Sequence, residues 1–158
     1  MFITRAIVPG FGIMARMAEP FRLLAANGCE WIIHPPVDPD GDGYVRRADI
    51  EVRTDGMAAR TTATLSVIFE KIDLAVFFAE LASDWRGWKG ERRWEALERE
   101  MAIDARHDGR ANVMIAVTVR RAERTYAGDV WPARVVFTVE AGEQLATLAS
   151  DIGSLLAA

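Results

Sequence analysis

The chain changes character at one stretch, Asp84-Trp85-Arg86-Gly87-Trp88-Lys89-Gly90-Glu91-Arg92-Arg93-Trp94, which holds three of its five tryptophans. Before it, apolar residues recur with the period of a helix. After it, they alternate with the period of a strand. The sequence therefore predicts a helix that leads into a run of strands, with this tryptophan segment (residues 84–94) as the joint between them.

The helix before the tryptophan segment is predicted over about residues 73–86. Asp73 is a residue type that caps helix N-termini, and Gly87 is a residue type that ends helices. One apolar stripe follows the cap, which places Trp85 in the core beside the rest of the stripe: Leu74, Phe77, Phe78, Leu81 and Ala82.

The residues after the segment predict further strands and a last helix. Strands are expected around 101–105, 113–119 and 135–139, where apolar residues alternate with others. The last helix is expected over about 143–156, with one buried stripe made of Leu145, Leu148, Ala149, Ile152, Leu155 and Leu156.

Glycine-containing turns indicate that the strands are antiparallel. Asn27-Gly28, Asp55-Gly56 and Asp108-Gly109 each separate two strand-like runs and fit the type I′ hairpin turn. The runs before the helix are 21–26, 29–34, 50–53 and 59–67. The predicted fold is α+β: an antiparallel β-meander sheet with two amphipathic helices packed on one of its faces.

Length and composition narrow the class of protein. A chain of 158 residues with 51% hydrophobic residues can form a single domain, expected here over residues 21–158. We expect residues 1–20 to be either disordered or a leader from a mis-assigned start. The net charge of −4 argues against nucleic-acid binding, and no apolar run is long enough for a membrane helix. A cytoplasmic location is expected.

Residues 38–49 follow the order of a calcium-binding loop. Three oxygens from one tight turn suit a hard cation. Against this, Pro35-Pro36 replaces the entering helix, and the residues after the loop alternate like a strand, so a solvated acidic turn is the alternative. The carboxylates at positions one, three, five and twelve of the loop are Asp38, Asp40, Asp42 and Asp49.

The tryptophan segment also predicts a binding surface. Aromatic side chains among basic ones form hot spots in protein interfaces and can also stack on nucleic-acid bases, although the acidic net charge disfavours the second. The alternative is a loop held on the core by its indoles, with arginines lying over them. The residues predicted to contact a partner are Trp88, Lys89, Arg92, Arg93 and Trp94.

No catalytic set stands out in the sequence. Cys29 and His34 would lie on opposite faces of one strand, and His107 is interpreted as a turn residue beside Asp108. No nucleophile, base and metal ligands converge, so we expect no enzymatic activity.

Three motifs carry a resemblance to known proteins. Residues 84–90, Asp108-Gly109 and Gly142-Glu143-Gln144-Leu145 resemble an uncharacterised family of small actinobacterial proteins of unknown function, over about residues 29–158. The order of helix, strands and final helix is also similar to WapI-type immunity proteins, which neutralise secreted toxins. The second resemblance implies a toxin-like protein partner, and neither resemblance assigns a role to a residue.

The sequence thus predicts a non-enzymatic binding protein of the immunity type, which masks a surface of a partner toxin and needs no cofactor. The alternative is a calcium-binding module that uses the loop at residues 38–49. The oligomeric state is left open.

Overall fold

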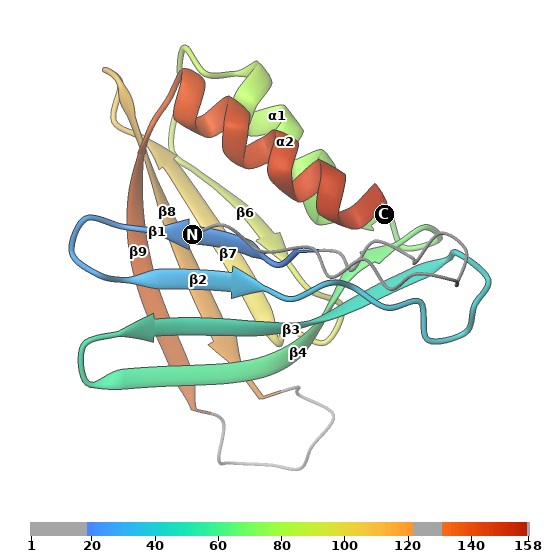
Figure 1. Cartoon of the computed structure of the whole chain (residues 1–158). Helices are drawn as coiled ribbons and strands as arrows, with labels where there is room; N and C mark the ends of the chain where they lie inside the picture. The colour runs from blue at the N-terminus through green and yellow to red at the C-terminus, as the bar shows by residue number, and fades with distance from the viewer. Residues whose placement is uncertain (1–18, 122–130, 158) are drawn as a thin grey trace, which may run out of the picture.

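The computed structural model describes residues 19–121 and 131–157. It places nine strands and two helices in this part of the chain, with every paired strand antiparallel (Figure 1). The predicted α+β class with antiparallel pairing is confirmed. The prediction of residues 1–20 as a leader or a disordered segment lies outside the described residues, except at Glu19 and Pro20.

The strands form two sheets, so the prediction of a single sheet is wrong. The first five strands pair in chain order as one sheet: β1 (Phe21–Leu24), β2 (Glu30–Ile33), β3 (Val45–Thr54), β4 (Met57–Val67) and β5 (Ile72–Asp73). The other four pair in order as a second sheet: β6 (Glu91–Glu95), β7 (Met101–His107), β8 (Asn112–Arg120) and β9 (Pro132–Glu140).

The break between the sheets falls at the predicted helix. Asp73 ends β5 and also caps α1 (Leu74–Ser83), where its side chain accepts hydrogen bonds from the backbone N–H groups of Ala75 and Val76. The chain therefore leaves the first sheet through this cap. It returns as β6, whose partner is β7 rather than any strand of the first sheet.

The glycine-containing hairpins lie where the sequence predicts them, but their turn type differs. Gly28, Gly56 and Gly109 have positive φ angles of 86°, 77° and 77°, whereas the residue before each does not. A type I′ turn requires positive φ at both positions. In two of the three hairpins, Asn27 and Asp108 accept hydrogen bonds from backbone N–H groups two residues on, and these short side-chain turns explain the difference there.

The two helices pack against each other as well as on strands. Figure 1 shows α1 beside α2 (Glu143–Ala157), and α2 also contacts β1 and β9. The predicted stripe of α2 is confirmed at its buried positions, Leu145, Leu148, Ile152 and Leu155. In the described residues, neither helix is both long and apolar enough to cross a membrane.

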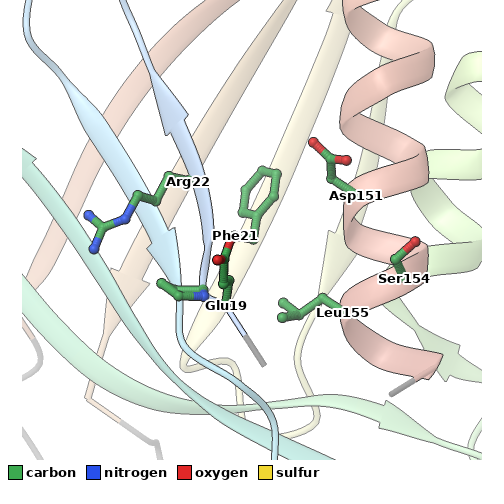
Figure 2. A pocket seen from close by; sticks show the side chains of 7 residues that line it. Glu19, Phe21, Arg22, Asp151, Ser154 and Leu155 are labelled. Atoms are coloured by element: carbon green, nitrogen blue, oxygen red, sulfur yellow. The ribbon is translucent and has the colours of Figure 1, made fainter. Parts of the chain in front are cut away.

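A groove separates β1 from α2 (Figure 2). Its labelled lining residues come from β1 and the segment before it on one side and from α2 on the other: Glu19, Phe21, Arg22, Asp151, Ser154 and Leu155.

The core lies between the two sheets and the helices. In Figure 1 the strands β1–β4 run across the direction of β7–β9, an orthogonal form of sheet packing. Trp31 of β2 is fully buried at the centre, with its ring 5.2 Å from that of Phe21 and 6.0 Å from that of Phe78 on α1.

Polar bonds also join the sheets. The Thr64 backbone N–H on β4 donates to the buried carboxylate of Glu100 at 2.8 Å, and the Thr61 hydroxyl donates to the Arg120 carbonyl at 2.9 Å. These two bonds use a backbone N–H of β4 and a backbone carbonyl of β8, and buried backbone groups of this kind need such partners.

Candidate partner-binding surface

The tryptophan segment begins at the C-terminal cap of α1 and ends in a strand. Asp84 is the cap, and its backbone N–H donates to the Glu80 carbonyl. Residues 91–95 form β6, with Arg92 opposite Ala105 and Trp94 opposite Ile103. The alternative interpretation of the segment as a loop therefore applies only to its first half.

Alternation along β6 gives Trp94 and Arg93 opposite surroundings. Trp94 faces the core and is 8% exposed. Arg93 faces outward and donates to Asp104 at 2.7 Å and to Glu95 at 2.8 Å. The hydrogen bond to Glu95, and to a smaller extent that to Asp104, raises the pKa of Arg93 above its ordinary value. Trp94 can offer a partner little surface, and Arg93 already has two acceptors.

Trp88 and Arg92 are fixed against each other. The Trp88 indole is half-buried, and its Nε1 donates to the Ala105 carbonyl at 3.4 Å. The Arg92 guanidinium lies 4.8 Å from the centre of that indole and donates to Asp84 at 2.7 Å. A cation over an indole face is favourable, and the ion pair keeps it there.

His107 contacts the first half of the segment from the core side. Its side chain is fully buried, and both ring nitrogens have partners. Nδ1 accepts from the Gly109 N–H at 2.9 Å, so Nε2 carries the proton and donates to the Trp85 carbonyl at 2.9 Å. Its ring also meets the edge of Trp88, with 5.3 Å between ring centres.

Gly87 allows the segment to lie directly on this ring. Its φ is 135°, a conformation that side chains disfavour, and a Cβ there would lie 3.4 Å from His107 Nδ1. His107 and Gly87 together fix the backbone on either side of Arg86. The sequence interpretation of His107 as a simple turn residue missed this role, which only the β7 register reveals.

Trp85 is the largest exposed side chain of the segment, so its predicted place in the core is wrong. It is 48% exposed, because α1 ends at Ser83 and Trp85 no longer continues the helical stripe. The Arg86 guanidinium lies 5.2 Å from the centre of its ring, and Lys89 is exposed nearby in the sequence. We call Trp85, Arg86, Trp88 and Lys89 the tryptophan surface.

The acidic loop uses its carboxylates internally. Asp38 accepts from the N–H groups of Gly41 at 3.0 Å and Gly43 at 2.6 Å, and the Gly43 bond is the main reason that the pKa of Asp38 is lowered. Asp42 accepts from the Tyr44 N–H at 3.1 Å, and Asp40 is exposed.

Asp49 is directed elsewhere. It lies within β3, where it accepts from Thr62 at 2.7 Å and Arg60 at 2.9 Å. Within residues 19–121 and 131–157, no three Asp, Glu, His or Cys side chains come together as a metal site would need. The calcium hypothesis stays a prediction, and the structure does not bring its four aspartates together.

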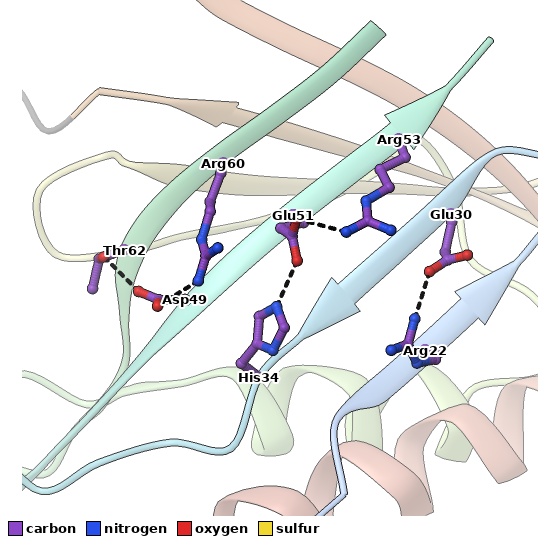
Figure 3. A network of polar contacts seen from close by, with 8 residues as sticks. All are labelled: Arg22, Glu30, His34, Asp49, Glu51, Arg53, Arg60 and Thr62. Atoms are coloured by element: carbon purple, nitrogen blue, oxygen red, sulfur yellow. Dashed lines mark hydrogen bonds and ion pairs between the residues drawn. The ribbon is translucent and has the colours of Figure 1, made fainter.

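The outer face of the first sheet carries a ladder of ion pairs (Figure 3). Arg22 pairs with Glu30 at 2.8 Å across β1 and β2, and Glu51 accepts from His34 at 2.6 Å and from Arg53 at 2.9 Å. Cys29 is buried and donates to Thr54, not to His34, so the two residues do not form a thiol–imidazole pair. These charges satisfy one another across β1 and β2, along β3, and between β3 and the residue that follows β2.

We expect this ladder to make stability depend on acid. The hydrogen bond from His34, and then that from Arg53, lowers the pKa of Glu51 below its ordinary 4.5. A carboxyl group whose pKa is lowered in the folded protein stabilises the fold at pH values above its ordinary pKa. That contribution is lost as the pH falls through the pKa of the folded state. Glu51→Gln should therefore flatten the loss of stability below about pH 4.5, by on the order of 1 kcal/mol or less.

The measurement is urea unfolding at a series of pH values. His34→Ala should remove more of this acid dependence than Arg53→Ala, because the bond from His34 is the larger cause. An unchanged pH profile in Glu51→Gln would show that the carboxylate is not stabilised by its neighbours.

Fold and surface together define an orthogonally packed two-sheet α+β protein, with an aromatic and basic surface on a loop whose backbone is hydrogen-bonded to His107. The chain belongs to the family of unknown function DUF6228, whose sequence model matches residues 34–158. No curated protein and no solved structure matches the chain. The predicted likeness to an uncharacterised family is confirmed at that level, while the likeness to immunity proteins stays a prediction.

Proposed function

We propose that this protein is a non-enzymatic binding protein that covers a surface of a partner protein in the cytoplasm, as an immunity protein covers its toxin. The observation that carries the proposal is Trp85, a tryptophan 48% exposed on a segment whose backbone is fixed by His107 and Gly87.

Trp85 has the properties of an interface anchor. Tryptophan and arginine are the residues most enriched among those that dominate binding energy. About half of the surface of Trp85 is open to solvent, and covering its apolar part would be favourable. Because the Trp85 carbonyl is already hydrogen-bonded to His107, the backbone would lose little conformational freedom on binding.

The neighbouring charges indicate the chemistry of the partner patch. Arg86 lies over Trp85, and Lys89 is exposed and forms no ion pair with another described residue. A complementary surface would combine an apolar hollow for the indole with carboxylates for these two cations. The predicted Trp94 and Arg93 would support this surface from β6 rather than contact the partner.

The test is co-purification with the products of the adjacent genes, followed by titration of any bound product. Trp85→Ala should weaken the complex by about thirtyfold, the loss of a typical hot spot. Val76→Ala is the matched control, since Val76 is 52% exposed on α1. It should change affinity by less than about twofold.

Two results would count against the proposal. One is that no neighbouring gene product forms a stable complex. The other is a complex that Trp85→Ala leaves as tight as the wild type, provided that both variants unfold at the wild-type temperature.

A further inference from the structure

The groove between β1 and α2 is a second surface, and it shares no residue with the tryptophan segment. Two hollows of about 530 and 760 Å³ adjoin along β1 and have Phe21, Arg22 and Asp151 in common. Figure 2 shows β1 on one side of the groove and α2 on the other. On this side its lining runs from Glu19 to Ala26, which is β1 with two residues at either end.

One wall of the groove is an unpaired strand edge. Within the described residues β1 pairs only with β2. The Ala25 N–H donates to the Cys29 carbonyl at 2.8 Å, so hydrogen-bonded pairs fall at Ala25 and at every second residue before it. The backbone N–H and C=O groups of Arg22 and Leu24 therefore point away from β2, toward the open edge. Such an edge is a template for another strand.

The opposite wall also offers hydrogen-bonding groups. Exposed polar residues of α2 line it at spacings of three, four and three, which places them on one helix face. They are Gln144, Thr147, Asp151 and Ser154. Between the walls lie buried apolar side chains, among them Phe21, Phe137 and Leu148. An extended chain placed here would meet donors and acceptors on both of its edges and apolar groups beneath it.

The lining of the groove is mostly acidic, which favours a basic ligand. Glu19, Glu140, Glu143 and Asp151 contribute carboxylates. Arg22 is the one cation among the described lining residues, and Glu30 already binds it at 2.8 Å. A segment with lysine or arginine at alternate positions would be attracted, and an acidic segment would be repelled.

We propose that this groove binds an extended, lysine- or arginine-rich segment of a partner protein, which adds to β1 as a further strand. Arg22 and Leu24 supply the backbone hydrogen bonds, the polar face of α2 supplies partners for the other edge, and the carboxylates bind the cationic side chains. This surface is separate from the tryptophan surface, so either can fail without the other.

The probe is a capped nine-residue peptide of alternating valine and lysine, titrated against the full chain by fluorescence anisotropy. Leu24→Pro removes an N–H that points away from β2, so it costs no internal ladder bond. It should weaken binding by about tenfold, whereas Leu24→Ala should stay within about twofold. The amide NMR signals of Arg22 and Leu24 should shift as the peptide binds.

Asp151→Lys provides a second variant that leaves the β1 backbone intact. It should weaken binding of the valine–lysine peptide more than Asp151→Asn does, and a valine–glutamate peptide should not bind the wild type. Trp85→Ala should bind the valine–lysine peptide as the wild type does, which separates this test from that of the tryptophan surface.

Four results would overturn the proposal. Leu24→Pro could bind the peptide as tightly as Leu24→Ala, or the valine–glutamate peptide could bind equally well. Sedimentation could show a dimer that Leu24→Pro dissociates, which would assign the groove to a second copy of the chain. Binding by a chain that starts at Glu19, with none by the full chain, would assign the groove to residues 1–18.

Discussion

Trp31→Ala should lower the free energy of unfolding by about 3–5 kcal/mol, the usual cost of removing a large buried aromatic side chain. Trp31 is fully buried and lies between Phe21 on β1 and Phe78 on α1. Its loss would leave a cavity where three elements meet, and the surrounding rings cannot all move to fill it. Urea unfolding followed by circular dichroism measures the change.

Trp31→Phe is the control for this prediction. The Trp31 Nε1 is buried and has no hydrogen-bond partner among the described residues, so phenylalanine loses area but also removes an unsatisfied donor. We expect this variant to cost less than half as much as alanine. Equal losses in the two variants would mean that Trp31 does not fill the junction as described.

His107→Ala should cost about 2–4 kcal/mol and should also free the loop that carries Trp85. The substitution removes a buried ring and leaves two backbone groups, the Trp85 carbonyl and the Gly109 N–H, without their partner. The loss should appear both in urea unfolding and as a broadened indole NMR signal from Trp85, because its backbone anchor is gone.

His107→Asn distinguishes packing from hydrogen bonding at this position. An asparagine carbonyl can accept from the Gly109 N–H much as Nδ1 does, but its side chain is too short to reach the Trp85 carbonyl. We expect an intermediate stability with a mobile Trp85. An alanine variant in which Trp85 stays as ordered as in the wild type would remove His107 from its proposed role.

Local signals in the sequence predicted most of the elements correctly. Asp73 caps α1 as expected, the glycine hairpins fall in place, and the buried stripe of α2 follows its helical period. Each of these depends on residues within a few positions of one another. Propensity, capping and periodicity act over that range, so one sequence is enough to reveal them.

The largest errors concern pairing at long range. Nothing near Arg92 marks residues 91–95 as a strand, because β6 exists only through its pairing with β7. The division into two sheets depends in the same way on which strand receives β6. Trp85 continues the apolar period of α1, but the helix ends at Ser83. The period alone cannot show at which residue a helix is capped and ends.

The surroundings of the tryptophans were not predicted correctly. The sequence placed Trp85 in the core and Trp94 among the partner-binding residues, whereas Trp94 is buried and Trp85 is exposed. That this segment binds a partner stays a prediction. The groove beside β1 left no signal, since it joins residues around 21–26 to residues around 144–155.

The family match begins at His34, in the middle of the first sheet. The hairpin of β1 and β2 lies before that boundary, yet it supplies Trp31 and covers the backbone edge of β3. A fragment that begins at this boundary would therefore expose Phe78, which Trp31 covers, and the unpaired backbone edge of β3. The folded unit therefore extends further toward the N-terminus than the region that the family model matches.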